Sequence, residues 1–470
     1  MEYTINLNVN YHFGENDTTT ENFTNNNEYL IKKIYTFLNN EYTIIKYNKE
    51  KLKELEKLKY DNIELTELFY ELSKFRSVVV RNNKVVVYSP AKSVDYDTFK
   101  AENPNESECW SEDFVDGTMI NVFYDNINES WEIATKSTVG GNILFFNDIK
   151  NYEDLKKSTS NPSNQENTDN IEYENSHNDE HEIELEYQVQ KYNTFRSMFF
   201  EACNANNFNL NSLDKRYCYV FVLQHPFNRI VTPVVLPVIF LIKIYEINND
   251  NFPQVQITDI NIPNLATTPP YIFLNTGVQF LNRYPITKYS DIENHYSSEN
   301  TPYYCVGCMI YNMNGVRTKI RNNNYEKVRK LRGNQPKLQY NYLCLKQENK
   351  IQDFLYYYPE HFVLFKKFKL LLFTYTNELF MNYISCFIRK EKPLKEYDFQ
   401  FKTHMYNLHD IYKKDLKPNG KYIDKKFVID YVNTLHPSQQ MFVINYKHHP
   451  EKNTENSEKV ESYCEIECVE

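Results

Sequence analysis

The chain has 470 residues, of which 41% are hydrophobic, and a formal net charge of −10. This length and composition can furnish two or three domains with hydrophobic cores, so the chain should fold. The acidic balance excludes a general polyanion binder, and any contact with nucleic acid must therefore come from a local basic surface.

The cysteines and the apolar segments bear on the cellular compartment. Nine cysteines are scattered along the chain, and its polar, aromatic start, MEYTINLNVNYHF, differs from a secretory signal. We therefore expect free thiols in an intracellular, cytoplasmic and reducing environment. The longest apolar run, residues 230–242, contains two prolines and is shorter than the roughly 20 residues of a membrane-spanning helix. It predicts a buried strand, and no contact with a membrane is expected.

Residues 1–75 predict a helical N-terminal region. From Asn22 to Phe75, Leu, Ile and Tyr recur at three- and four-residue steps between Lys and Glu. At Arg76 the period changes to two, and RSVVVRNNKVVVYSP predicts a β-hairpin with Asn82-Asn83 at its turn. Further strands are predicted in GTMINVFYD and SWEIATKS. A twisted antiparallel sheet is therefore expected to begin at Arg76.

Residues 76–340 predict an α+β domain with an insertion. The insertion, residues 156–182, holds almost no aliphatic residues and is expected to be disordered. A helix in YQVQKYNTFRSMFFEAC is followed by predicted strands in CYVFVLQHP, NRIVTPVVLPVIFLIKIYEI, YYCVGCMIYN and VRTKIRN. Residues 350–447 return to helical spacing and predict an all-α domain, and residues 448–470 predict a flexible tail.

Five short segments occur in the order found in one enzyme family. FRSVVVRNNKVVVYSPAKS resembles a strand pair that ends in a pocket-rim lysine, here Lys92, and DFVDGTMINVFYD resembles a nucleophile motif, Lys-x-Asp-Gly. WEIATKSTVGGN, YVFVLQHPFNRIV and CVGCMIYNMNGVRTKIRNNNYEKV are similar to the motifs that follow. Together they resemble the adenylyltransferase domain of bacteriophage-type ATP-dependent RNA ligases, among the covalent nucleotidyltransferases. The resemblance implies an antiparallel-sheet nucleotidyltransferase domain of the ATP-grasp-like ligase type, with helical regions before and after it.

The chain departs from this family at the positions that carry the chemistry. By the alignment, Phe114 replaces the nucleophilic lysine, and Val222 and Val306 replace two glutamates. Neighbouring stretches hold no lysine or acid that would restore them when the alignment is shifted. Phenylalanine cannot attack phosphorus, and valine cannot bind Mg²⁺. We therefore expect no catalytic residue, no metal site and no required cofactor.

The three apolar residues raise a structural hypothesis. We expect Phe114, Val222 and Val306 to converge and to fill the former catalytic centre with apolar contacts, because three polar positions have become hydrophobic together. The alternative is that each is an ordinary strand residue facing a core.

Residues 315–337 form a basic segment on this acidic chain. Tyr325, Tyr340 and Tyr342 lie in or near it and could stack on the bases of single-stranded RNA. The alternative is a solvated helix face with internal salt bridges. The expected RNA contacts are Arg317, Lys327, Arg329, Lys330, Arg332 and Lys337. By the resemblance, the expected contacts to a nucleotide or phosphate are Lys92, Asp116, Lys136, Lys319 and Arg321, although Asp116 could instead be a turn residue before Gly117.

Other candidate residues have structural interpretations. Cys305 and Cys308 have the spacing of metal ligands without a second pair at zinc-type distance, which favours structural thiols. His225 is expected to be a hydrogen-bonded structural residue, because no nucleophile with a partner acid is readable near it.

The sequence therefore predicts a pseudo-nucleotidyltransferase, an RNA-ligase-like protein that binds RNA or nucleotide phosphates without ligating. Its helical C-terminal domain could dock RNA or a protein partner. One alternative is an active RNA ligase that uses ATP and Mg²⁺ and a displaced lysine such as Lys136 or Lys92. The other is a structural scaffold. The residues do not identify the RNA, the protein partner, the biological process or the oligomeric state.

Overall fold

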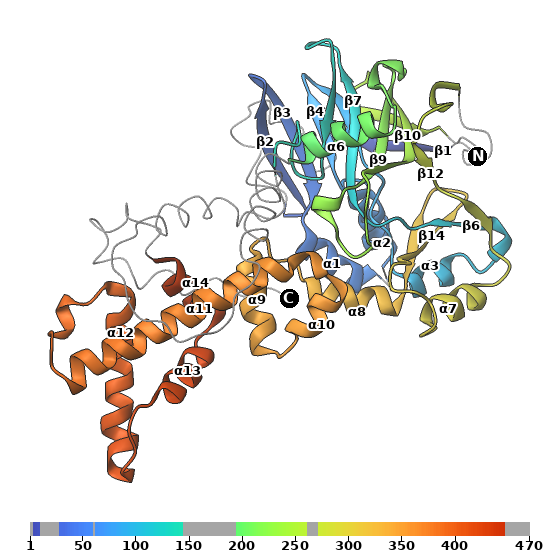
Figure 1. Ribbon diagram of the computed structural model, residues 1–470. Helices are drawn as coiled ribbons and strands as arrows, with labels where there is room; N and C mark the ends of the chain where they lie inside the picture. Colours follow the sequence, from blue (N-terminus) through green and yellow to red (C-terminus); the bar gives the residue numbers. More distant parts are fainter. Residues whose placement is uncertain (1–2, 10–27, 60–61, 144–193, 261–270, 447–470) are drawn as a thin grey trace. The chain divides into compact units, whose positions relative to one another are not determined.

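The computed structural model describes residues 3–9, 28–59, 62–143, 194–260 and 271–446 (Figure 1). The predicted insertion at 156–182 and the predicted tail at 448–470 lie outside these ranges. The chain divides into two units. The first comprises Met1–Phe145 and Tyr192–Lys330, and the second comprises Phe146–Lys191 and Leu331–Glu470.

Three sheets, antiparallel apart from one short parallel pairing, make up the first unit. The largest has the order β1 (Tyr3–Asn8), β11 (Gln254–Asp259), β10 (Val238–Asn251), β9 (Tyr217–Gln224), β7 (Thr118–Asp125) and β8 (Ser130–Ala134), and β12 (Gln279–Phe280) pairs in parallel with β10. The second contains β2 (Leu30–Phe37), β3 (Asn40–Tyr47), β4 (Val78–Arg81) and β5 (Lys84–Tyr88). The third contains β13 (Arg283–Pro285), β6 (Cys109–Asp113), β14 (Gly307–Asn312) and β15 (Arg317–Arg321). The predicted α+β class with antiparallel sheets is confirmed.

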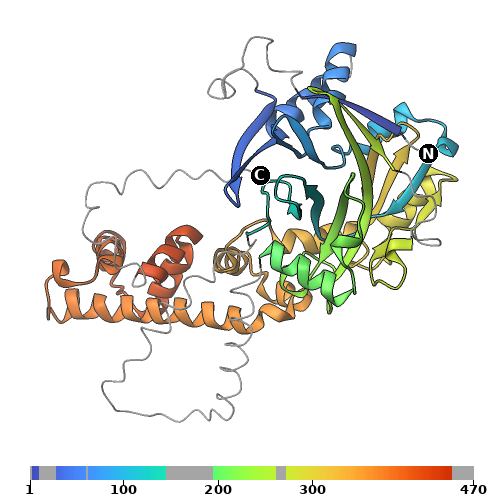
Figure 2. The same cartoon turned by 90° about the horizontal axis from the view of Figure 1, so that it is seen from above.

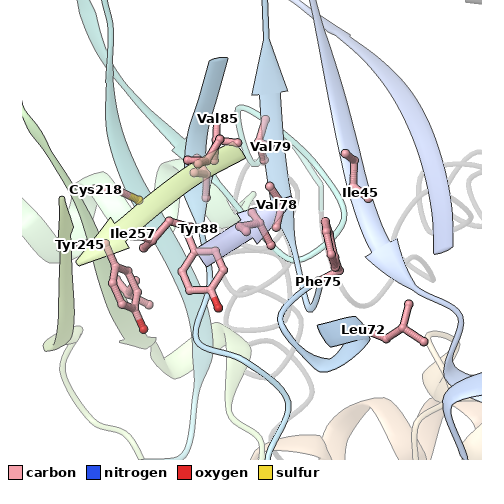
Figure 3. Packing of buried hydrophobic residues seen from close by; sticks show 14 of the residues in the cluster. Ile45, Leu72, Phe75, Val78, Val79, Val85, Tyr88, Cys218, Tyr245 and Ile257 are labelled. Atoms are coloured by element: carbon pink, nitrogen blue, oxygen red, sulfur yellow. The ribbon is translucent and has the colours of Figure 1, made fainter. Parts of the chain in front are cut away.

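The main core of this unit lies between the first two sheets (Figure 3). Val79 on β4 and Val85 on β5 are buried with Ile257 on β11. Tyr88 and Tyr245 meet edge to face, with ring centroids 5.1 Å apart. The hairpin beginning near Arg76 therefore covers one face of the large sheet.

The other face of the large sheet is covered by helix α6 (Phe195–Ala205), which buries Phe199 against Phe221 of β9. Alternate residues of β9 enter different cores: Val220 belongs to the core under β4 and β5, and Phe221 belongs to the core under α6. Burial on both faces explains why the sequence of β9 is apolar without alternation.

The predicted helix before residue 48 is wrong. Residues 30–47 form the hairpin β2–β3, with Leu38 and Asn39 at positive φ in its turn. Its register is fixed by tertiary pairing, because Ile44 of β3 lies opposite Val79 of β4. The apolar spacing of residues 22–47 matched a helical period, but burial of Tyr42 and Ile44 follows the period of two.

The helical part of the N-terminal prediction is confirmed for α1 (Lys49–Leu58) and α2 (Ile63–Ser73). Residues 1–75 do not form a region of their own, because β1 pairs with β11 and β3 pairs with β4.

Most predicted elements of the middle region are present. The β4–β5 hairpin turns at Asn82 and Asn83, whose φ angles are 46° and 55°. The long strand predicted from Asn228 begins only at Val238, because Pro233 and Pro237 have no N–H to donate to a sheet. The remaining helices of the first unit are α3 (Tyr96–Glu102), α7 (Tyr289–Ser297) and α8 (Asn323–Arg332), whose last two residues belong to the second unit.

The described part of the second unit is helical, as predicted for residues 350–447. Its helices are α9 (Leu338–Gln347), α10 (Ile351–Tyr357), α11 (Phe362–Tyr383), α12 (Phe399–Ile411), α13 (Lys425–Thr434) and α14 (Pro437–Asn445), and a π-helical segment, Ile384–Ile388, continues α11. Figure 2 shows the long helix α11, in orange, with the other helices of this unit along one side of it. None of the helices in the described ranges combines the length and apolarity needed to cross a bilayer.

Candidate phosphate-binding site

The connection from β6 to β7 carries the Asp-Gly step that resembles the nucleophile motif. Asp116 is buried, and its Oδ2 accepts hydrogen bonds from the backbone N–H groups of Val231, at 2.8 Å, and Thr232, at 3.0 Å. Its Oδ1 accepts a hydrogen bond from the Tyr325 hydroxyl at 2.8 Å. Both carboxylate oxygens are therefore used to hold the loop after β9 and helix α8 to this connection. The expected contact of Asp116 with phosphate is replaced by a structural role.

Position 117, which follows Asp116, requires a glycine. Its φ is +147°, and a Cβ added there would lie 2.5 Å from the Leu223 carbonyl oxygen and 2.7 Å from Cγ1 of Val222. The β6–β7 connection therefore passes directly against β9, and a larger residue would clash with its backbone.

The three apolar substitutions lie on neighbouring segments. The backbone N–H of Phe114 donates to the carbonyl of Gly307, at 3.3 Å, next to Val306. The contact of Gly117 with Val222 brings the third segment to the same connection. Val222 and Val306 are buried, whereas Phe114 is half-buried, with its ring centroid 5.6 Å from the Arg321 guanidinium carbon. The convergence of the segments is confirmed, and direct packing of the three side chains on one another stays a prediction.

Four cationic side chains converge from four different segments. The backbone N–H of Tyr47 donates to the Phe75 carbonyl at 2.7 Å, which places Arg76 beside the end of β3. Lys46 Nζ donates to Ser137 Oγ at 3.1 Å, which holds the loop after β8 against the same strand. In that loop, Lys136 Nζ lies 5.4 Å from the ring centroid of Tyr47. The fourth cation, Lys319 on β15, lies near enough to Arg76 for the guanidinium charge to lower its pKa. We call Lys46, Arg76, Lys136 and Lys319 the cation cluster.

Burial and, after it, repulsion between cations lower the pKa values of the cluster. Lys319 is exposed on β15, but neighbouring atoms remove part of the water around its amine, and this effect, followed by repulsion from Arg321 and Arg76, lowers its pKa to about 8. Burial, followed by repulsion from Arg76 and Lys46, lowers the pKa of Lys136. Burial also lowers the pKa of Arg76 to about 10. Arg76, Lys46 and Lys49 lower the pKa of Lys136, and Arg321, Arg76, Lys92 and Arg317 lower that of Lys319. Like charges held together in this way form a site for an anion.

Lys92 stands beside the cluster but already has a partner. Its Nζ lies 3.0 Å from both carboxylate oxygens of Glu56 and 5.0 Å from the ring centroid of Phe69. Its charge nevertheless helps to lower the pKa of Lys319. Lys92 and Arg321 thus lie near Lys319, with Lys92 partly neutralised, while the convergence of Lys136 with them on one nucleotide pocket stays a prediction.

Arg317 is wrong as a predicted RNA contact. It is buried, and its guanidinium donates to the backbone carbonyl groups of Ala91, at 2.6 and 2.9 Å, and Pro90, at 3.1 Å. This side chain fastens the loop that carries Lys92 to β15. Arg317 is thus needed for the shape of the site and is not available to a ligand.

The rest of the predicted RNA-binding segment is divided. A carboxylate oxygen of Glu326 lies 2.5 Å from the Arg321 guanidinium and 3.4 Å from that of Arg329. The alternative of a helix face with internal salt bridges is confirmed for Arg329 on α8, whereas Arg321 makes its salt bridge from β15. Arg332 is buried, while Lys327, Lys330 and Lys337 are exposed. Tyr325 and Tyr342 are buried as well, so their predicted role as stacking surfaces is wrong, and Tyr340 is half-buried.

The donor set does not fit the divalent metal that the family resemblance implies. Val222 and Val306 have no oxygen to offer, and the oxygens of Asp116 are used by Val231, Thr232 and Tyr325. In the ranges that the structure describes, no three His, Cys, Asp or Glu side chains are grouped so that they could hold a metal ion. Any phosphate bound here would be neutralised by lysine and arginine.

Two further expectations are confirmed. Burial raises the pKa of the Cys308 thiol to about 12 and also raises the pKa of Cys305, as expected for structural thiols. His225 is buried, its Nδ1 accepts from the N–H of Phe227 at 3.2 Å, and its Nε2 lies 3.2 Å from Glu201. Burial lowers the pKa of His225, consistent with a neutral structural imidazole.

Sequence reasoning missed Lys46 and Arg76 as site residues. Arg76 stands where the hydrophobic period changes, but that position alone carries no functional signal. Lys46 was hidden by the helical interpretation of the β2–β3 hairpin. Comparison of the chain with protein-family models and with curated proteins gives no match.

Proposed function

We propose that this chain is a pseudo-nucleotidyltransferase, related in fold to RNA ligases, that binds RNA or nucleotide phosphates without ligating them. The observation that carries the proposal is the cation cluster of Lys46, Arg76, Lys136 and Lys319, because its positive charges lie close enough together to lower the pKa of Lys136 and Lys319. Phosphate oxygens accept hydrogen bonds from lysine and arginine and would relieve the repulsion among them. The ring of Tyr47 lies beside Lys136 and offers an aromatic surface to a base.

Phe114 supports the absence of ligation. It stands two residues before Asp116, where the nucleophile motif has its lysine, and its ring contacts the Arg321 guanidinium. A covalent adenylate requires an amine at phosphorus, and no amine exists at this position.

A second function is favoured by one observation. The lowered pKa values of Lys136 and Lys319 increase the fraction of neutral amine, which is the nucleophilic form. An active ligase would use Lys136 in place of the missing lysine. Lys92, the other displaced lysine considered, is less suited because Glu56 holds its ammonium form.

One experiment separates these functions. The chain is incubated with ATP carrying a radioactive α-phosphate and Mg²⁺ and is then run on a denaturing gel. Covalent label that is lost in Lys136→Ala supports the ligase and overturns our proposal. Absence of label, together with retention of radioactive ATP or 5′-phosphorylated single-stranded RNA on a filter, supports the proposal. If the chain retains neither ligand at low salt, the scaffold is the better interpretation.

Charge-reversal variants locate the binding. We expect Lys136→Glu with Lys319→Glu to weaken retention at least tenfold, because two positive charges of the cluster become negative. The matched control is Lys84→Glu with Lys288→Glu, which changes the net charge equally at exposed positions of the first unit outside all predicted contacts. Because protein cations neutralise the ligand, retention should persist when EDTA removes divalent ions. Equal weakening by both variants would point to a general charge effect and contradict the assignment to the cluster.

A further inference from the structure

Helix α11 has two apolar faces, and only one of them is buried. On the inner face, Phe365, Phe368, Leu372, Tyr375 and Leu379 form the core of the helical unit. The opposite face presents Val363, Leu370, Phe373, Met381 and, on the π-helical segment, Ile388, which are 37, 62, 52, 56 and 58% exposed. We call these five residues the outer face of α11. In Figure 2 the other helices of this unit lie along one side of α11, in agreement with this division.

The outer face is continuous along the helix. Its members recur at intervals that keep them within about a third of the helix circumference. With the π-helical segment, the face extends over roughly 40 Å at 1.5 Å per residue. Lys425 of α13 reaches the ring of Phe373, at 5.2 Å from its centroid, and leaves half of that side chain exposed. An apolar strip of this length on a helix marks an interaction surface.

Four of the five residues of the outer face are placed symmetrically about the middle of the helix, whereas the fifth, Phe373, has Glu378 at its symmetric position. Val363 and Ile388 are equally far in sequence from the midpoint between Tyr375 and Thr376, and so are Leu370 and Met381. Two pairs of polar residues follow the same rule: Thr374 matches Asn377, and Lys366 matches Ser385. If two copies of α11 lie antiparallel, each apolar residue of these pairs therefore meets an apolar residue, and each polar one meets a polar one. Self-complementarity of this kind is what a twofold interface between identical chains requires.

We propose that the outer face of α11 is a homodimer contact, in which α11 packs antiparallel against α11 of a second copy. If each side chain is given about 150 Å², the lower end of the range for aromatic residues, five at roughly half exposure supply on the order of 400 Å² of apolar area per copy. With the polar residues at its edges, the contact reaches the roughly 1,000 Å² in total that a specific interface needs.

Charge favours the antiparallel arrangement. Lys366 is the charged residue in the polar series named above, and antiparallel packing places it beside the C-terminal half of the opposing helix, where the helix dipole is negative. Parallel packing would place Lys366 of one copy against Lys366 of the other. Parallel packing would also place Asn377 of one copy against Asn377 of the other. Antiparallel packing instead places the Asn377 amide beside the Thr374 hydroxyl of the second copy.

The first test is the mass of the full chain in solution, measured by light scattering after size exclusion at micromolar concentration. We expect twice the 56.5 kDa of one chain. Leu370→Glu with Met381→Glu should reduce the mass to that of one chain, because two carboxylates per copy would be buried against apolar residues. Tyr422→Glu is the matched control: Tyr422 is 75% exposed in the same unit, outside the outer face, and this variant should stay dimeric. Circular dichroism checks that both variants remain helical.

The second test fixes the orientation. Chains with Leu370→Cys are mixed with chains with Met381→Cys, oxidised and digested, and the disulfide-linked peptides are identified by mass spectrometry. The antiparallel contact predicts a link between the two different variants in preference to links within either one. A preference for links between two Leu370→Cys chains would overturn the antiparallel order. A monomer at every accessible concentration, or a dimer that Leu370→Glu with Met381→Glu leaves intact, would overturn the proposal and direct the search to another segment of the chain, a different protein or a lipid surface.

Discussion

Replacing Asp116 should destabilise the first unit strongly, although this residue resembles part of a catalytic motif. Asp116→Ala removes the acceptor of two backbone N–H groups and of the Tyr325 hydroxyl, all at 2.8–3.0 Å. A hydrogen bond to a charged group contributes about 1.5–3 kcal/mol, and a buried donor left without an acceptor is unfavourable by about as much. Because the three bonds share one carboxylate and water can enter the space left behind, we expect the free energy of unfolding to fall by about 3–5 kcal/mol.

The two tryptophans make this measurement specific. Trp110 on β6 and Trp131 on β8 are the only tryptophans of the chain, and both belong to the first unit. Urea unfolding followed by their fluorescence therefore reports on the unit that contains Asp116. Asp116→Asn should retain part of the stability, because its amide oxygen still accepts, and Asp250→Ala, at an exposed position, serves as the control. A loss below about 1 kcal/mol for Asp116→Ala would refute the structural role given to this carboxylate.

Three further predictions concern the site. Raising the pH from about 7 to 9 should weaken phosphate binding, because Lys319, with a pKa of about 8, loses its charge in this range, and Lys319→Arg should remove that part of the pH dependence. Without ligand, the same rise in pH should stabilise the fold, because the pKa of Lys319 is lower in the folded chain than in the unfolded chain. The free energy of unfolding should increase between about pH 8 and the ordinary lysine pKa of 10.5, and urea unfolding at several pH values measures this increase. Gly117→Ala should reduce the free energy of unfolding by about 2–3 kcal/mol, because the added Cβ would meet the Leu223 carbonyl oxygen at 2.5 Å and the φ of this residue is positive. Gly420 also has a positive φ but no neighbour within 4 Å of an added Cβ, so Gly420→Ala should reduce the free energy of unfolding less. Equal losses would contradict the steric argument.

Local signals in the sequence predicted much of the fold. The β4–β5 hairpin is specified by alternating valines and by Asn82-Asn83, which accept positive φ, so no distant residue is needed to recognise it. The β2–β3 hairpin lacks such independence. Its residues repeat at a spacing compatible with a helix, and only the pairing of Ile44 with Val79 decides for a strand. Tertiary pairing of this kind cannot be read from one segment.

The site was less predictable than the fold. The resemblance to RNA ligases pointed to Lys136 and Lys319, but the cation cluster also needs Lys46 and Arg76, which lie far from them in the sequence. The basic segment failed for a different reason. From the composition of this segment, Arg317 was predicted to be a surface charge. Its guanidinium is instead buried and donates hydrogen bonds to backbone carbonyl groups of a loop distant in the sequence. Charge is visible in a sequence, but its burial depends on the elements that pack around it.

The double-sided burial of the large sheet makes strand alignment an unusual problem for this chain. In a sheet with one solvent-exposed face, sliding a strand by one residue exposes its apolar side chains to water, which is unfavourable. Sliding β9 by one residue would exchange Val220 and Phe221 between two hydrophobic cores. Discrimination must then rest on polar markers, and Asn121 of β7, opposite Val220, is one: its amide is fully enclosed and donates to Ser89 at 3.0 Å. Sliding β7 by one residue would turn that amide to the other face of the sheet, away from Ser89, so Asn121 helps to fix the alignment of β7 with its neighbours.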